Sequence, residues 1–494
     1  MEDTLSPEVS VPISVFQQIL TSANSSTLEE TLDSLLENSR TVHGRSDLAS
    51  KNILSLILQL TESLSNPSTR HLLFSSLKLL RNLCAGEIAN QTSFIEHNGV
   101  KIVSIALSSM GFGSESDFGI VRMGLQLLGN VSLAGEEHQS HVWDQFFPVE
   151  FREIAKIRRQ EVCDPLCMVI YTCCNGSYER VGELCGVQGL PILAEIIRTA
   201  SEVGFGEDWL KLLLSRICFK EFHFLPLFFE LHLDVAAEGG GDIKYGDDRF
   251  TTEQAFLLSI LSERLNQRID EITFSNDFAL CILGILKRAV GVIDSVSRNK
   301  SGLPTGSAAI DVLGYSLTIL RDVCAQDGIG DSKKEGSMDA VNSLVSSGLV
   351  ELLLGLLRDL EPPEIIRKSI KQGENQVGKN YDLPKVCPYK GFRRDIVAVI
   401  GNCLYRKKNV QDEVRNRNGI LLLMQQCATD EDNPFLREWG IWSVRNLLED
   451  NADNQREVAE LELQGSVDVP EIAGLGLRVE VDQKTRRAKL VNLS

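Results

Sequence analysis

Apolar residues recur three and four positions apart along most of the chain. One such stripe runs from Leu72 to Leu83 and another from Leu344 to Leu357. This spacing places the apolar side chains on one face of an α-helix. The alternation of apolar and polar residues that is typical of strands is confined to Leu477–Val481, near the end of the chain. The pattern predicts an all-helical protein.

A short phrase with an asparagine recurs between these stripes. Its copies are LLRNL at 79–83, LLGNV at 127–131, VIGNC at 399–403 and VRNLL at 444–448. We call their asparagines, Asn82, Asn130, Asn402 and Asn446, the marker asparagines. The first two lie 48 residues apart and the last two 44, close to the ~40 to 47 residues of armadillo and HEAT repeats. The sequence therefore predicts an all-α, armadillo/HEAT-like, right-handed α-solenoid superhelix.

Breaks in the repeat pattern suggest where the chain divides. The expected parts are an N-terminal tail (1–25), N-terminal armadillo-like repeats (26–200), middle helical repeats (201–360), a flexible linker or long loop (361–390), C-terminal repeats (391–464) and a C-terminal tail (465–494). Two acidic, glycine-rich loops, at 236–250 and 326–338, are expected to interrupt the middle repeats. Asn-Gly and Ser-Gly steps are expected where one helix ends in a left-handed residue before the next begins.

Composition narrows the class of partner. Only 6% of the residues are aromatic, which favours helices packed on helices, and the formal net charge is −18. Such an acidic surface repels phosphate backbones at long range, so nucleic acid is not expected as a partner.

The chain is expected to remain in the cytosol, with a nuclear pool as an alternative. Met1-Glu2-Asp3 is acidic where a signal peptide would be basic. The most apolar stretch, Phe222–Leu233, is 12 residues long, short of the ~20 that span a membrane. The 12 cysteines form no CxxC pair, so buried free thiols are expected rather than disulfides or zinc ligands.

The most specific motifs lie just before the C-terminal tail. They are FRRDI at 392–396, IGNCLY at 400–405, NVQD at 409–412, DNPFLREWGIW at 432–442 and VRNL at 444–447. This block closely resembles the C-terminal domain of the ataxin-10 family. EDWL at 207–210 resembles the same family more loosely, and the resemblance extends over residues 30–465.

The resemblance to the ataxin-10 family implies a function that periodicity does not show. It implies a non-enzymatic scaffold that acts in cytokinesis, cell survival and development, and that associates into small homo-oligomers. A plant homologue is favoured because the residues before 390 depart most from the animal-type pattern. Other proteins are expected to bind along the concave surface of the solenoid.

Residues 433–447 predict a helix with a broad aromatic face. Asn433 is suited to an N-cap and Pro434 to the first helical position. Trp439, Trp442 and Asn446 then follow at helical spacing from Phe435. Such a face in a last repeat either packs inward and seals the stack, which we favour, or is presented to a partner. In the second case Arg437, Trp439, Trp442, Arg445 and Asn446 are candidate partner-binding residues.

The pair Trp442 and Asn446 also suggests an alternative function, a transport adaptor or nuclear shuttle. In armadillo nuclear-import adaptors, an Asn amide bonds an extended basic peptide while a Trp four residues earlier stacks on its side chains. Here the residues four before the other marker asparagines are Lys78, Gln126 and Ala398. The ladder is absent, so a structural role for the marker asparagines is the better interpretation.

A basic cluster stands out on this acidic chain. It consists of Arg393, Arg394, Arg406, Lys407, Lys408, Arg415 and Arg417. A solvated helix face is the simpler interpretation. The alternatives are pairing with acidic segments of the chain itself and binding of an acidic partner, for which Arg393 and Arg394 are candidates.

Nothing in the motifs predicts catalysis. The sequence contains no GxGxxG, Walker, HExxH or GxSxG motif, and its histidines are scattered. We therefore expect no enzyme activity, no cofactor, no metal and no small-molecule substrate.

Overall fold

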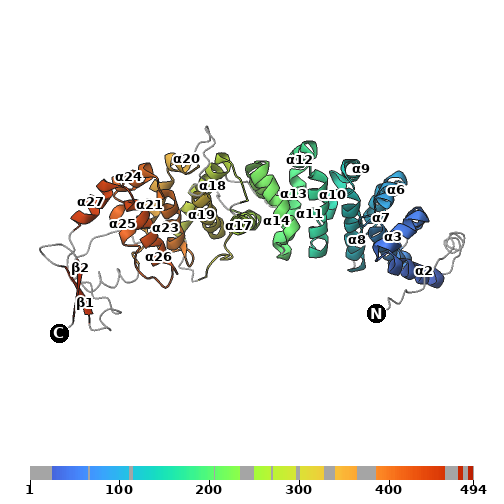
Figure 1. Ribbon diagram of the computed structural model, residues 1–494, viewed down its shortest axis with the longest axis horizontal. Helices are drawn as coiled ribbons and strands as arrows, with labels where there is room; N and C mark the ends of the chain where they lie inside the picture. Colours follow the sequence, from blue (N-terminus) through green and yellow to red (C-terminus); the bar gives the residue numbers. More distant parts are fainter. Residues whose placement is uncertain are drawn as a thin grey trace. The chain divides into compact units, whose positions relative to one another are not determined.

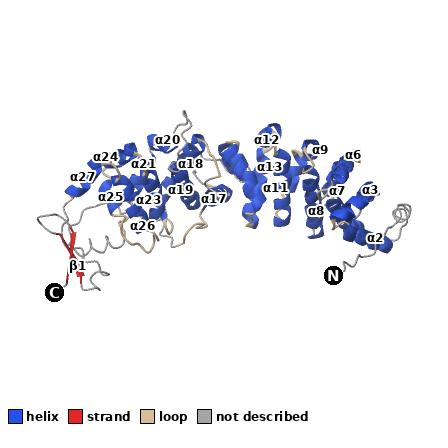
Figure 2. Cartoon of the chain, in the orientation of Figure 1, coloured by secondary structure: helices blue, strands red, loops and turns tan. Residues whose placement is uncertain are grey.

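The computed structural model is built almost entirely of helices (Figure 2). It describes residues 25–64, 67–110, 115–204, 206–233, 250–268, 271–295, 301–326, 340–363, 385–461, 477–481 and 488–492. The predicted N-terminal tail, most of both acidic loops and most of the linker at 361–390 lie outside these ranges, apart from residues at their edges.

Two compact units make up the chain. Unit 1 comprises Met1–Val292 and Pro304–Ile319, and unit 2 comprises Ile293–Leu303 and Leu320–Ser494. The division differs from the boundaries expected from composition, which stay predictions. Within each unit the predicted all-α solenoid architecture is confirmed, because successive helices stack on one another.

Unit 1 begins with repeats of two shorter helices followed by a longer one (Figure 1). Its helices are α2 (Ser25–Asn38), α3 (Val42–Ser50), α4 (Ile53–Ser63), α5 (Arg70–Leu83), α6 (Ile88–Glu96), α7 (Gly99–Ser108), α8 (Glu115–Ser132), α9 (Glu136–Phe146), α10 (Val149–Ala155), α11 (Gln160–Cys174), α12 (Tyr178–Leu184), α13 (Leu190–Val203), α14 (Asp208–Ser215), α15 (Phe224–Leu233), α17 (Thr252–Gln267) and α18 (Asn276–Ala289). Helices α2, α5, α8, α11 and α14 pack on one another in that order.

Unit 2 contains a helical stack of its own. Helix α19 (Ala308–Gln326) starts in unit 1 and ends in unit 2. The following elements are α20 (Ala340–Ser346), α21 (Leu349–Asp359), α23 (Phe392–Leu404), α24 (Lys408–Asn416), α25 (Ile420–Met424), α26 (Leu436–Leu448), α27 (Ala452–Glu460), β1 (Leu477–Val481) and β2 (Ala488–Asn492). Helices α23 and α26 pack together, and the two strands pair antiparallel with Leu477 opposite Asn492.

Left-handed residues separate consecutive helices, as the Asn-Gly and Ser-Gly steps predicted. Asn98 precedes α7 with φ 55°, Asn418 precedes α25 with φ 53°, and Gly348 precedes α21 with φ 85°. At the two Asn-Gly steps the asparagine, and not the glycine, takes the left-handed conformation, which Asn tolerates better than most residues.

The cysteines are free thiols, and most are buried. Burial raises the pKa of Cys173 to about 11, despite a hydrogen bond with Ser132 that lowers it. The prediction of buried free thiols is therefore confirmed for nine cysteines, while Cys281, Cys387 and Cys427 are half-buried.

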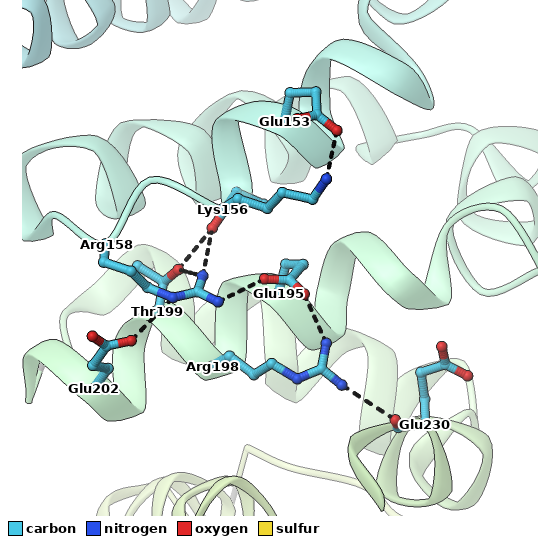
Figure 3. A network of polar contacts seen from close by, with 9 residues as sticks. Glu153, Lys156, Arg158, Glu195, Arg198, Thr199, Glu202 and Glu230 are labelled. Atoms are coloured by element: carbon cyan, nitrogen blue, oxygen red, sulfur yellow. Dashed lines mark hydrogen bonds and ion pairs between the residues drawn. The ribbon is translucent and has the colours of Figure 1, made fainter. Parts of the chain in front are cut away.

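A polar network joins three parts of unit 1 (Figure 3). Arg158, which follows α10, pairs with Glu195 of α13 at 2.9 Å, and Glu195 also pairs with Arg198 at 2.9 Å. Arg198 then donates to the Glu230 carbonyl in α15 at 3.4 Å. Burial alone would raise the pKa of Glu195, but the bonds and charges of Arg158 and Arg198 lower it below its usual value.

Among the described residues, no single helix is long and apolar enough to cross a bilayer. Helices α20 and α21 meet the criterion only as a pair, which is bent by 61°.

Candidate protein-binding surface

The marker asparagines hold neighbouring repeats together. Three of them donate from Nδ2 to a backbone carbonyl of an earlier long helix, each at 2.9 Å: Asn130 to Arg81, Asn402 to Arg321 and Asn446 to Gly401. Arg81 and Gly401 each directly precede a marker asparagine. Asn82 donates instead to Ser39 Oγ at 3.0 Å. These amide groups are engaged within the stack, so they cannot bond a peptide backbone as the amides of import adaptors do.

A second asparagine in the repeat has a related role that sequence reasoning missed. Asn90 donates to the carbonyl of Leu83, and Asn454 donates to that of Leu447, both at 2.9 Å. Each carbonyl lies at the C-terminal end of a long helix, where backbone acceptors lack intrahelical partners. The signal was present, since each residue follows its marker asparagine by eight positions.

Helix α26 begins later than the sequence predicts. Its first residue is Leu436, and its N-cap is Phe435, which is left-handed with φ 65°. Asn433 does not cap the helix; it is buried, and its Oδ1 accepts the Arg393 backbone N–H at 2.9 Å. The predicted start at Asn433-Pro434 is wrong because α23 competes successfully for the Asn433 side chain.

The aromatic face of α26 does not seal the stack. Its buried residues are Leu436, Gly440, Ser443, Asn446 and Leu447, none of which is aromatic. Phe435 is 69% exposed and Trp442 is 42% exposed. The preference for inward packing is therefore wrong for these two rings, and Trp439 is half-buried.

The exposed side of α26 presents apolar and cationic groups together. Ile441 is 51% exposed, and Arg437 and Arg445 are also exposed. The Arg445 guanidinium lies 4.9 Å from the centre of the Trp442 ring, a cation–π contact that holds the ring in place. We call Phe435, Arg437, Ile441, Trp442 and Arg445 the Trp442 surface.

Two candidates from the sequence are not part of this surface. Asn446 is fully buried. Arg393 is only 3% exposed; its guanidinium donates to Gln426 Oε1 at 3.2 Å and to the Glu361 carbonyl. Neither side chain can contact a partner while buried, so both leave the set of candidates.

The rest of the basic cluster pairs largely with the chain's own groups. Arg394 lies 2.7 Å from Asp395, and Arg415 lies 2.9 Å from Asp412. Arg417 pairs with Glu351 at 3.1 Å. Intrachain carboxylates therefore neutralise part of the cluster, as the alternative of pairing within the chain predicted.

Asp395 itself is buried in the first turn of α23. Tyr389 donates its hydroxyl to Asp395 Oδ2 at 2.9 Å. Burial raises the pKa of Asp395, although Arg394, Tyr389 and Arg321 act in the opposite direction. This group anchors the start of α23 rather than facing a partner.

The helices of this surface lie in a region that matches a known family of protein domains. Residues 392–491 match the model described as the spinocerebellar ataxia type 10 protein domain. This part of the chain is therefore similar to the ataxin-10 domain. The match begins at the first residue of α23 and includes α26, so the Trp442 surface lies inside the matched region.

Similarity to ataxin-10 extends well beyond this domain. Ataxin-10 of Bos taurus is 26% identical over 453 residues, which cover 88% of this chain and 88% of that protein. Ataxin-10 of Homo sapiens is 26% identical over 417 residues, 84% of this chain and 81% of that protein. An ataxin-10 homolog of Dictyostelium discoideum is 29% identical over 175 residues, 33% of this chain and 29% of that protein. The predicted resemblance to the family is confirmed; a plant origin stays a prediction.

Two solved structures show a more distant likeness. A chain from a study of the phosphorylation switch between cadherin and beta-catenin is 13% identical, with a TM-score of 0.37, covering 89% of this chain and 76% of that one. An engineered protein is 12% identical, with a TM-score of 0.31, covering 88% of this chain and 99% of that one. These TM-scores are too low to support a fold assignment, which is based on the helix packing described above.

The ataxin-10 domain and the stacked helices support a protein-interaction scaffold in general. Both also suggest that the chain is not a catalyst. Within the part of the chain that the structure describes, no three His, Cys, Asp or Glu side chains gather as ligands of a metal would.

Proposed function

We propose that the chain is a non-catalytic scaffold that binds other proteins through the Trp442 surface. The observation that carries this proposal is the exposure of Trp442 beneath the Arg445 guanidinium. Trp and Arg are enriched among the residues that dominate binding energy at interfaces, where a ring held in place loses little entropy on binding. The flanking Phe435 and Ile441 would extend the apolar contact.

The biological role is proposed from the resemblance to ataxin-10. It comprises action in cytokinesis, cell survival and development, from a cytosolic location with a nuclear pool as the alternative. Self-association into small homo-oligomers is part of the same proposal. A Trp-centred apolar surface is suited to either a second copy or another protein.

Affinity capture tests the surface directly. Tagged wild-type chain and the Trp442→Ala variant are used to capture proteins from cell extract, which mass spectrometry identifies, and light scattering gives the mass of each purified chain. We expect the Trp442→Ala variant to lose specific partners, to form a smaller oligomer than wild type, or both. Because Trp442 is on the surface, the variant should fold, which circular dichroism verifies.

The matched control is Tyr178→Ala, which removes an aromatic ring that is 84% exposed at the start of α12. It should retain every partner and the wild-type mass. A folded Trp442→Ala variant with unchanged partners and mass would overturn the proposal.

A further inference from the structure

A set of cationic side chains lies across α5 and α8 in unit 1. Lys78 and Arg81 belong to α5, and Arg122 and Gln126 belong to α8. Arg81 Nη1 donates to Gln126 Oε1 at 2.9 Å, which brings the two helices' side chains together. Arg122 stands four residues before Gln126 on α8, so the two side chains share one face of that helix. Burial lowers the pKa of Arg81, and the positive charge of Arg122 lowers it further.

No carboxylate neutralises this set among the residues that the structure describes. Arg81 donates to neutral groups, the side chains of Gln126, Asn82 and Met123. For Lys78 and Arg122 no ion pair or hydrogen bond occurs within the described ranges. A chain with net charge −18 has acidic residues in excess, and it uses one on the same two helices, where Arg70 pairs with Asp117 at 2.8 Å.

The positions of these residues matter as much as their charge. Lys78 and Gln126 each stand four residues before a marker asparagine. At the corresponding positions a basic-peptide ladder has tryptophan, whose ring attracts cationic side chains. Lys78 and Gln126 at these positions favour an acidic peptide instead of a basic one. A lysine attracts carboxylates, and an amide N–H can donate to them.

Aromatic rings border the cationic set. Phe74, four residues before Lys78, and Phe118, four before Arg122, are both half-buried. The Arg159 guanidinium lies 4.6 Å from the centre of the Phe118 ring. The surface therefore offers limited apolar contact next to its charges.

We propose that Lys78, Arg81 and Arg122 bind an acidic, extended segment of a partner protein. Packed helices lie ~8 to 10 Å apart, and an extended peptide rises ~3.3 Å per residue. Carboxylates two to four residues apart on such a segment would then meet α5 and α8 in turn. The guanidinium groups are suited to paired contacts with carboxylates. The proposal rests on the scaffold function but uses a surface separate from the Trp442 surface.

Fluorescence anisotropy with the full chain tests this site. The probe is a short fluorescein-labelled peptide with Asp or Glu at every third position, and the reference probe has Asn or Gln at those positions. We expect saturable binding of the acidic probe alone, weakening as salt is raised. The double variant Lys78→Glu/Arg122→Glu should weaken binding about tenfold or more, because attraction becomes repulsion at two sites.

The control is Lys101→Glu/Arg152→Glu, which makes the same change of charge at two exposed residues of α7 and α10. It should change the affinity less than about threefold, as expected of a general charge effect. Arg122→Gln, which removes one charge without adding another, provides a milder variant if the double variant does not fold. Circular dichroism checks the fold of every variant.

Three results would overturn the proposal. They are no saturable binding of the acidic probe to wild type, an equal loss in the control variant, and competition by a short single-stranded RNA as effective as that by the acidic peptide. None of them bears on the Trp442 surface, whose test uses other variants and whole-extract partners, so failure of the two proposals can be told apart.

Discussion

A marker asparagine stabilises the stack because its buried amide satisfies a backbone carbonyl in the neighbouring repeat. Asn446 is the clearest example, since its side chain is fully buried and its Nδ2 lies 2.9 Å from the Gly401 oxygen. Replacing it with alanine leaves that carbonyl unsatisfied and opens a small cavity. We expect Asn446→Ala to lower the free energy of unfolding by about 2 to 3 kcal/mol in urea denaturation.

Comparing Asn446→Ala with Asn82→Ala separates the effect of burial from the effect of losing an asparagine. Asn82 is half-buried, and its Nδ2 donates to the Ser39 hydroxyl. That hydroxyl also donates to the Leu36 carbonyl at 2.8 Å, so it keeps a partner when Asn82 is lost. The loss of Asn82 should cost about 1 kcal/mol or less. Equal costs for the two variants would contradict the view that the buried carbonyl, rather than the asparagine itself, sets the penalty.

Glu195 provides a prediction about pH. Its pKa is lower in the folded chain than usual, so the stabilisation it gives is complete above the ordinary glutamate pKa of about 4.3 and is lost as the pH falls through the lower folded value. Glu195→Gln should therefore cost about 1 to 2 kcal/mol at neutral pH. The difference from wild type, measured by urea denaturation at several pH values, should shrink below about pH 4. A constant difference across that range would argue against an ionic role.

At the scale of elements, the close contact of α23 and α26 depends on a glycine. A Cβ at Gly401 would lie 2.5 Å from Ser443 Oγ but 3.5 Å from Ser443 Cβ. The hydroxyl is held by the carbonyls of Val397 at 3.1 Å and Trp439 at 2.7 Å. Gly401→Ala should therefore lower the free energy of unfolding by about 1 to 3 kcal/mol.

A double-mutant cycle tests that contact. Ser443→Ala removes the clashing oxygen, so the double variant Gly401→Ala/Ser443→Ala should cost at least about 1 kcal/mol less than the sum of the single changes. Gly440→Ala is the control, because its Cβ would meet the Gln426 backbone oxygen at 2.5 Å. Combined with Ser443→Ala it should show no such rescue. If the costs of Gly401→Ala and Ser443→Ala simply added, the clash with the Ser443 hydroxyl would not be the cause, and α26 would instead move to accommodate the new Cβ.

The same helix pair shows what sequence could and could not predict about elements. Helical spacing and the marker asparagines predicted α23 and α26 correctly, because both depend on local pattern. The start of α26 was predicted wrongly because the Asn433 side chain bonds α23 instead of capping α26. The burial of Arg393 depends on Gln426 and Glu361, which lie more than 30 residues away along the chain. The Asn433 side chain could bond either helix, and the choice depends on how the helices pack, which the sequence does not give.

At the scale of the whole molecule, the repeat period was the decisive signal for the fold. The marker spacing predicted a stack of helices, and the C-terminal motifs predicted the ataxin-10 domain that the family model matches. Pattern alone did not indicate a division near residue 293, because breaks in composition mark insertions in a stack as readily as they mark unit boundaries. The cationic set on α5 and α8 likewise emerged only when two distant helices were placed together.

A stack of repeats should also unfold locally, since each repeat contacts mainly its neighbours. Hydrogen exchange measured by mass spectrometry on Asn446→Ala tests this expectation. Peptides from α23 and α26 should exchange about tenfold faster or more than in wild type, because the lost hydrogen bond lowers their opening free energy. Peptides from α5 and α8, which belong to unit 1, should exchange at the wild-type rate. An equal acceleration in α5 and α8 would instead mean that the chain opens as one cooperative unit, and that the energetic influence of a marker asparagine extends far beyond its own repeat.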